Sequence, residues 1–452
     1  MSIFVGGASR VINPALGDDI CGQLHRRFCE YIHDDLEANL LYLRSGEERA
    51  PGGAEVLLGS LDLAGIWVDD DLPQTRAAIS AATGVPERSI ILTSTHTHEG
   101  PDTGGFIAPD SGKNAAYLAR LRDGLVSAAQ EAVSGAAPAR VGWGQGRAHV
   151  GFNRRLCWAD GTHSMYGDSS RPDFTGLEGP DDPSHSVLWA VDEAGRPLAV
   201  VHGNCSHATC MEGEQFASAD FPGEARRLVR AALGVGTTPG QLPVLYMQGA
   251  SGDVSPWNML RVPYRHDGEQ RAHEMGALLA GETLRLMLES PPVAEPVLRH
   301  AYEDLTLGVR LPDEAVLARA REISAGGDEG NKRWNWVIAT CGTLRLYEEF
   351  KDHPYDTVPV HAVRIGDYAL LTNPCELYCQ FGLDMKRRSP AAVTAVAQLA
   401  DAAPLSPGYC PTIYGQMGGG YSGDPIYWSR LEPNAGYKIV DASARLVRGL
   451  WK

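Results

Sequence analysis

The feature that most constrains this chain is the alternation of short apolar runs with longer amphipathic segments along its 452 residues. Apolar runs bounded by turn residues are typical of strands, whereas apolar residues spaced three and four apart indicate helices. Alternation of the two favours an α/β fold. We therefore expect mixed β-sheets flanked by α-helices, with strands at 54–63, 88–98, 186–193, 196–207, 242–249 and 362–373 and helices at 70–84, 115–135, 222–234, 270–290, 312–326 and 376–388.

Two Pro- and Gly-rich stretches, 167–183 and 288–296, interrupt this alternation. They are predicted to be loops, because neither is long enough to be a flexible linker between independent domains. The sequence has no internal repeat. We therefore expect residues 1–452 to form one domain.

The charge of the chain excludes several classes of partner. Forty Lys and Arg residues face 56 Asp and Glu residues, which gives a formal net charge of −16. Such a chain is a poor general partner for nucleic acid or an anionic membrane, so a small-molecule substrate is expected. The sequence starts without a signal-like segment and has no run long enough to span a membrane, which predicts a cytoplasmic location. Nine cysteines without a CxxC pair predict reduced thiols.

Two histidines stand at the end of the predicted strand 88–98, in the motif "THTHEGP". Side chains at i and i+2 of a strand point to the same face, so His96 and His98 are expected to stand side by side at the strand end. Neutral imidazole is the commonest protein ligand of zinc and similar metals. Two hydrogen-bonded structural histidines would give the same pattern, so further ligands are needed to support a metal site.

Polar residues also follow the other predicted strands, where sites form in open α/β sheets. Histidines and one carboxylate from separate strand ends are a plausible catalytic zinc set that keeps a position for water. Taken singly, Glu376 could favour a helix N-terminus and Ser255 could cap a helix. The residues at these strand ends are His96 and His98, His207, Asp253 with Ser255, Glu376, and Tyr409.

At these residues the sequence resembles the catalytic domain of the neutral/alkaline non-lysosomal ceramidase family. The similar segments occur in the family's order over almost the whole chain. They are "GASRVINPALG", "HDDLEANLLYL", "THTHEGP", "GFNRRL", "NCSHAT", "SADFPG", "QGASGDVSPW", "NPCELYCQFGLDMKRRSP" and "GYCPTIYGQMGGGY".

The resemblance implies a role for eight residues. One zinc ion per chain would be bound by His96, His207, Glu376 and Tyr409. The resemblance also implies four residues around the reaction centre. His98 would face that centre, Arg154 would bind a substrate carbonyl or oxyanion, Ser255 would be a nucleophile or a hydrogen-bond donor, and Tyr421 would border the pocket.

The sequence also departs from the family pattern. Glu99 replaces a serine, Ala208 a proline and Cys375 a glycine, all next to implied site residues. We expect this chain to lack the family's signal segment and its C-terminal immunoglobulin-like domain. A smaller or more polar amide than long-chain ceramide is therefore expected as substrate. Thiols near the ligand segments leave a cysteine ligand or another metal as an alternative; these are Cys205, Cys210, Cys375, Cys379 and Cys410.

The leading hypothesis is a zinc-dependent hydrolase, an amidohydrolase that cleaves a linear N-acyl amide bond in a small molecule. In this hypothesis His98 carries a proton to the departing amine and Arg154 stabilises the oxyanion. One alternative is an esterase or lactonase that uses the same site. A second is a metal-stabilised binding protein without catalysis, which predicts a closed ligand sphere. A homo-oligomer is compatible with each of these.

Overall fold

The computed structural model describes residues 2–46, 54–65, 71–104, 114–238, 240–327, 333–401 and 407–452. Its largest element is an eight-stranded sheet in which the two end pairs are parallel and the pairs between them are antiparallel. In spatial order the strands are β16 (Val244–Gln248), β14 (Pro197–Asn204), β13 (Ser184–Asp192), β8 (Ala137–Arg147), β1 (Ile3–Val11), β5 (Glu37–Ser45), β6 (Glu55–Leu61) and β7 (Ile90–Ser94).

A four-stranded sheet packs against one face of the large sheet. An apolar cluster lies between them, and it joins Val5 and Leu58 of the large sheet to Val363 and Leu370 of the small one, all buried. The small sheet runs in the order β18 (Leu298–Gly308), β19 (Tyr355–Ile365), β20 (Tyr368–Thr372) and β22 (Val393–Ala397).

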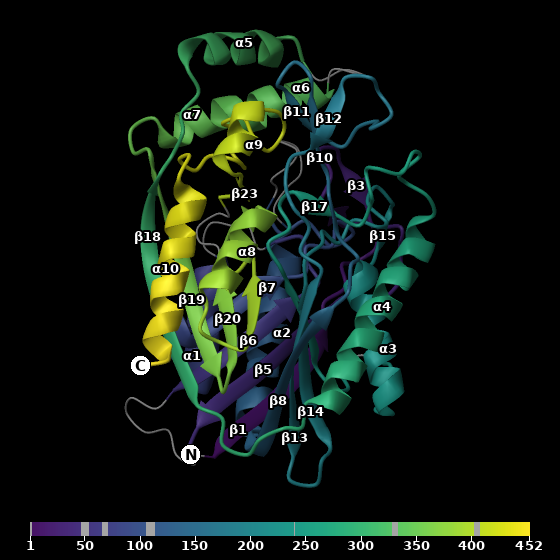
Figure 1. The fold of residues 1–452 in the computed structure, drawn as a ribbon, viewed down its shortest axis with the longest axis vertical. Helices are drawn as coiled ribbons and strands as arrows, with labels where there is room; N and C mark the ends of the chain where they lie inside the picture. The colour runs from purple at the N-terminus through teal and green to yellow at the C-terminus, as the bar shows by residue number, and fades with distance from the viewer. Residues whose placement is uncertain are drawn as a thin grey trace.

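Helices cover the outer faces of both sheets, as Figure 1 shows, and the prediction of mixed sheets flanked by helices is confirmed. On the large sheet these are α1 (Asp71–Thr83), α2 (Ala115–Ser134), α3 (Asp220–Leu233) and α4 (Gly268–Glu289). On the small sheet they are α8 (Cys379–Arg388) and α10 (Ala435–Leu450), which share an apolar cluster with β19 and β20.

The sequence explains how closely these layers approach. Asn114 caps α2 with its side chain, and Leu121 and Leu125 face the large sheet one turn apart. In β1, a Cβ on Gly6 would lie 1.9 Å from the carbonyl oxygen of Ala132 in α2. Only glycine allows the helix to lie this close to the strand.

Shorter elements gather beyond one end of the two sheets, at the top of Figure 1, while both termini lie at the other end. The short strands are β2 (Asp19–Ile20), β3 (Arg27–Phe28), β4 (Tyr31–Ile32), β9 (Phe152–Asn153), β10 (Arg155–Trp158), β11 (His163–Met165), β12 (Phe174–Leu177), β15 (Phe216–Ala217), β17 (Val254–Ser255), β21 (Glu376–Leu377) and β23 (Tyr409–Cys410). The helical segments there are α5 (Glu314–Ala325), α6 (Arg333–Val337), α7 (Arg345–Phe350), α9 (Ile413–Gly418) and a π-helical turn (Ile338–Leu344). A 3-10 turn (Glu87–Ser89) leads into the first residue of β7.

Three sequence-based boundaries are wrong in detail. The predicted loop 167–183 contains strand β12, and the helix predicted at 376–388 begins only at Cys379. The strand predicted at 88–98 ends at Ser94, before both histidines. Asp70 of the first predicted helix and residues 402–406 before Tyr409 lie outside the described residues. No helix among the described residues is long and apolar enough to cross a membrane.

Candidate active site

The chain segments that leave β7, β14, β16 and β20 meet at one place. β7 runs antiparallel to β14 and β16 in the sheet order, yet these strands deliver their carboxyl ends to the same region. The two ends of the sheet are in contact, since the hydroxyl of Ser60 in β6 donates to the carbonyl of Tyr246 in β16 (2.8 Å) and the hydroxyl of Thr93 in β7 contacts Met247 Sδ in β16 (3.8 Å). The large sheet thus brings together residues from both of its ends.

His96 lies in the loop after β7 and has a left-handed backbone, with φ of 65°. Its backbone N–H donates to the carbonyl of Leu63 (2.8 Å), and its ring Nδ1 donates to the carbonyl of Ala64 (2.5 Å). The expectation that His96 and His98 share a strand face is therefore wrong, because the left-handed turn at His96 ends the extended backbone. The two rings still meet edge to face, with centroids 4.9 Å apart.

His207 faces these rings from the loop after β14. Its Nδ1 donates to the carbonyl of Ser251 (2.7 Å), as that of His96 does to Ala64. A carbonyl can only accept, so both rings carry their proton on Nδ1 and present the lone pair of Nε2 to the centre. His98 Nε2 lies 3.4 Å from His96 Nε2, and the three rings offer nitrogen atoms within 4.8 Å of one another.

Glu376 brings a carboxylate to the same centre, and its Oε2 lies 3.0 Å from His207 Nε2 and 3.5 Å from His96 Nε2. Acceptors this close repel one another unless a cation lies between them. Two ligands of a tetrahedral metal with bonds of about 2.0 to 2.1 Å are about 3.3 Å apart. The residues present therefore fit a metal ion.

Tyr409 is the direct neighbour of Glu376, because β21 and β23 pair in parallel and place these two residues in register. The structure thus brings together His96, His207, Glu376 and Tyr409, the four residues predicted as ligands. It adds His98 to the cluster, since the group of ring nitrogens able to hold a metal ion includes His98 together with His96 and His207.

Electrostatics at the centre favour a carboxylate surrounded by neutral rings. Burial raises the pKa of Glu376, but a proton held by His96 or His207 outweighs burial and holds that pKa well below its usual range, so Glu376 is the first of these groups to lose its proton. Burial, reinforced by His96 and His207, holds the pKa of His98 well below its usual value. An anionic oxygen beside neutral imidazoles is the donor set that a divalent cation requires.

Arg154 places a permanent positive charge next to this cluster. Its Nη2 donates to Gly252 O (3.0 Å) and lies 2.8 Å from His207 Nε2, while its Nη1 donates to the hydroxyl of Tyr166 (2.9 Å). Burial opposes the charge, but the neighbouring Tyr166 and Tyr409 outweigh it and raise the pKa of Arg154. In this structure the guanidinium contacts the lone pair of His207 that a metal would use.

The two remaining predicted site residues are Ser255, which hydrogen-bonds to the main chain, and Tyr421, which packs against other aromatic rings. The hydroxyl of Ser255 is buried, and its hydrogen-bond partners among the described residues are main-chain atoms of Trp257, both at 3.3 Å. None of the described residues contacts it as a base. Tyr421 packs its ring against Tyr409 (5.6 Å between centroids) and against Trp334 (5.5 Å). An aromatic row therefore leads from exposed Trp334 to the cluster.

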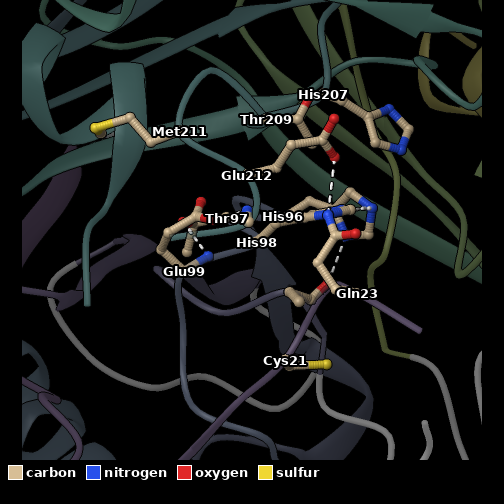
Figure 2. A network of polar contacts seen from close by, with 12 residues as sticks. Cys21, Gln23, His96, Thr97, His98, Glu99, His207, Thr209, Met211 and Glu212 are labelled. Atoms are coloured by element: carbon tan, nitrogen blue, oxygen red, sulfur yellow. Dashed lines mark hydrogen bonds and ion pairs between the residues drawn. The ribbon is translucent and has the colours of Figure 1, made fainter. Parts of the chain in front are cut away.

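Glu99 does not face the histidine rings. Its Oε1 lies 3.3 Å from Arg27 Nη1, and Figure 2 shows the carboxylate on the far side of Thr97 from the rings. Arg27 also donates to the carbonyl of His98 (2.5 Å), so the pair supports the loop that carries the histidines. Glu99 consequently adds no charge to the reaction centre.

The cysteines near the ligand segments remain free thiols and do not join the cluster. All nine cysteines of the chain are unpaired and buried. Cys205 donates to the carbonyl of Ala250 (2.7 Å), and Cys210 contacts Met275 Sδ (3.5 Å). Among the described residues, the group able to hold a metal consists of histidines alone.

Sequence reasoning missed three residues next to the centre, Tyr166, Gln23 and Glu212. Tyr166 lies in an irregular loop without a motif. Gln23 and Glu212 meet near His98, where Gln23 Nε2 donates to Glu212 Oε2 (3.1 Å; Figure 2). Glu212 lies only five positions after His207, and this proximity is the one sequence signal that could have suggested it.

Comparison with known proteins supports the resemblance. No family model matches the sequence. The neutral ceramidase of Mycobacterium tuberculosis is 25% identical over 236 residues, which are 50% of this chain and 35% of that protein. The chain therefore matches only about a third of that relative's length.

Solved structures give the same answer for the fold. A ceramidase complexed with C2 superposes with a TM-score of 0.75 at 18% identity, over 100% of this chain and 75% of that one. The neutral ceramidase of Pseudomonas aeruginosa gives a TM-score of 0.73 at 18% identity, over 99% and 75%. Sequence and fold together confirm the resemblance: half of the chain is similar in sequence to a neutral ceramidase, and nearly the whole chain shares the fold of the two solved structures.

Proposed function

We propose that this chain is a zinc-dependent amidohydrolase that cleaves a linear N-acyl amide in a small molecule. The observation that carries the proposal is the convergence of His96, His207 and Glu376 on one point. Carbonyls fix the protons of both imidazoles on Nδ1, so two lone pairs and a carboxylate face that point, with the Arg154 guanidinium beside them. Zinc is proposed because it accepts nitrogen and oxygen ligands and leaves a position for substrate in catalytic sites.

A zinc ion at this point would polarise the amide carbonyl and make water a stronger nucleophile. Arg154 would stabilise negative charge on the carbonyl oxygen, since Gly252 and Tyr166 hold its guanidinium at the cluster. His98 Nε2 would accept a proton as water adds to the carbonyl carbon. It would return the proton to the nitrogen as the C–N bond breaks. Water is the proposed nucleophile because, in the part of the chain that the structure describes, the hydroxyl of Ser255 bonds main-chain atoms of Trp257 and no base.

The substrate is proposed to be an amide smaller or more polar than long-chain ceramide. Support comes from polar groups beside His98, where Gln23 and Glu212 meet the partly exposed Arg265. On the other side, Trp334 and Tyr421 offer aromatic surface for an apolar acyl group. Glu99 no longer supports this proposal, because it is paired with Arg27 away from the centre.

An untargeted screen of N-acyl amides of increasing chain length, with a matched ester of each acyl group, tests the function. The zinc-loaded protein should hydrolyse an amide, and a chelator should abolish turnover until zinc is restored. Turnover of esters alone would favour the esterase or lactonase. No turnover by protein that holds stoichiometric zinc would favour the binding protein, and efficient ceramide turnover at low substrate concentration would refute the substrate class.

A further inference from the structure

A carboxylate without a role in the proposed reaction lies next to His98, on the side of the ring away from the cluster. His98 Nε2 faces His96, so its Nδ1 points outward from the centre. This Nδ1 is buried and has no hydrogen-bond partner among the described residues. A buried ring N–H without an acceptor is costly, and it leaves the ring orientation undetermined.

Glu212 is the carboxylate that can satisfy this nitrogen. Its Oε2 lies 3.7 Å from His98 Nδ1, and its side chain is only 10% exposed. Movement of the carboxylate by under about 1 Å would bring the two atoms within hydrogen-bond distance. Other groups hold the carboxylate in place, because Gln23 Nε2 donates to Oε2 (3.1 Å) and Arg265 pairs with Oε1.

The surroundings keep His98 and Glu212 facing each other. Gly22 has φ of 106°, and a Cβ there would lie 2.6 Å from the Cβ of His98, so the segment before Gln23 packs directly on the histidine. Arg265 stacks over the ring of Tyr166 (5.0 Å), whose hydroxyl accepts from Arg154. One polar chain therefore runs from the back of His98 to the arginine of the reaction centre.

We infer that Glu212 is a positioning residue, which accepts the Nδ1 proton of His98 and so keeps the Nε2 lone pair directed at the reaction centre. The inference rests on the proposed function for its kinetic consequence and on geometry alone for the hydrogen bond. A carboxylate behind a reacting imidazole fixes its tautomer and raises its basicity.

The kinetic test compares Glu212→Gln with the exposed neighbour Glu214→Gln as a matched control. Glu212→Gln should lower kcat by about 10- to 100-fold, with KM changed less than about twofold and zinc retained, since an oriented imidazole matters in the transition state. Glu214→Gln should match wild type. In a His98→Ala background, Glu212→Gln should cost less than about twofold, because its partner is gone. The inference would be overturned if Glu212→Gln lowered kcat by the same factor in wild type and in His98→Ala. It would also be overturned if Glu212→Gln lost zinc while His98→Ala kept it.

A spectroscopic test separates this inference from the proposed function. In zinc-loaded protein labelled with 15N-histidine, His98→Ala identifies the Nδ1–H resonance of His98. That resonance should be protected from solvent exchange in wild type and in Glu214→Gln, and lost or shifted in Glu212→Gln. An unchanged resonance in Glu212→Gln would overturn the inference even if the enzyme is active. If the protein hydrolyses no amide or ester, the proposed function is refuted. The resonance of His98 would still show whether Glu212 accepts the Nδ1 proton.

Discussion

Glu376 and Tyr409 stand directly opposite each other in the parallel pair β21–β23, although 32 residues of sequence separate them. Main-chain bonds fix the pair, since Glu376 N–H donates to Gly408 O (2.7 Å) and Tyr378 N–H donates to Cys410 O (3.2 Å). Backbone pairing therefore sets the separation of two proposed ligands, and their side chains are free to serve the metal.

Glu376→Gln should lose zinc and keep the fold. The substitution leaves the main-chain pairing intact but removes the anionic oxygen that lies 3.0 Å from His207 Nε2. We expect zinc content well below one equivalent by elemental analysis, with an unchanged circular dichroism spectrum. Glu30→Gln, at an exposed position, is the control. Full zinc occupancy in Glu376→Gln would remove the carboxylate from the ligand set.

Arg154→Lys should lower kcat/KM by about 10² to 10³ while zinc stays bound. Lysine keeps the charge, but its ammonium cannot contact Gly252 O and the Tyr166 hydroxyl together as the guanidinium fork does. Tyr166→Phe should lower kcat/KM less, by about tenfold, because Arg154 keeps its hydrogen bond to the carbonyl of Gly252. Steady-state kinetics on one amide checks both variants, and a larger loss in Tyr166→Phe than in Arg154→Lys would contradict the order.

Acid should destabilise the fold through two buried histidines between the large sheet and α4. Burial lowers the pKa of His185 to about 4, and burial together with His185 lowers the pKa of His202 further. Between about pH 6.5 and 4 the unfolded chain binds protons that the folded chain refuses, so stability is present above pH 6.5 and falls as the pH drops. His185 alone contributes a loss of about 3 kcal/mol by pH 4.

His202→Phe should flatten this acid dependence, since neither ring nitrogen of His202 has a hydrogen-bond partner among the described residues. Urea unfolding at pH 7.5, 5.5 and 4.5, in chelator so that the metal site does not contribute, measures the free energy of unfolding. Parallel curves for wild type and His202→Phe would show that the pKa of this histidine is the same in the folded and unfolded states, which would contradict the prediction.

Limited proteolysis should not release two stable halves, in keeping with the proposal of one domain over residues 1–452. The cluster between the sheets draws on Val5, Leu188, Leu298 and Leu370, which span most of the chain. A cut anywhere between them leaves each piece with part of that cluster exposed. Two separately folded fragments with sharp unfolding transitions would contradict the proposal.

The sequence predicted which residues gather at the cluster, but it did not predict their local geometry, and both outcomes have physical reasons. Apolar runs mark strands, and sites form at strand ends, so His207 and Glu376 could be found from pattern alone. The left-handed backbone of His96 could not, because tertiary contacts with Leu63 and Ala64 impose it. The sequence did not indicate Glu212 and Tyr166, because their proposed roles depend on which residues contact them in the folded structure.

His96→Ala and His98→Ala should differ in kind. His96 presents a fixed lone pair to the centre, so its loss should remove zinc. His98 is proposed to move a proton, so His98→Ala should keep zinc and lose about 10² to 10⁴ in rate, or roughly 3 to 5 kcal/mol. Amide hydrolysis should suffer more than hydrolysis of the matched ester, because the amine is the poorer leaving group and needs the proton.

Zinc content and kcat/KM on an amide and its matched ester, measured for both variants, decide between the roles. The ring nitrogens of His96 and His98 are only 3.4 Å apart, which also suits two ligands of one ion. If His98→Ala loses zinc as readily as His96→Ala, the three histidines form the ligand set, and another group must protonate the amine. If zinc stays and the ester is spared, His98 supplies the proton and is not a required ligand, as expected when His96, His207, Glu376 and Tyr409 bind the ion.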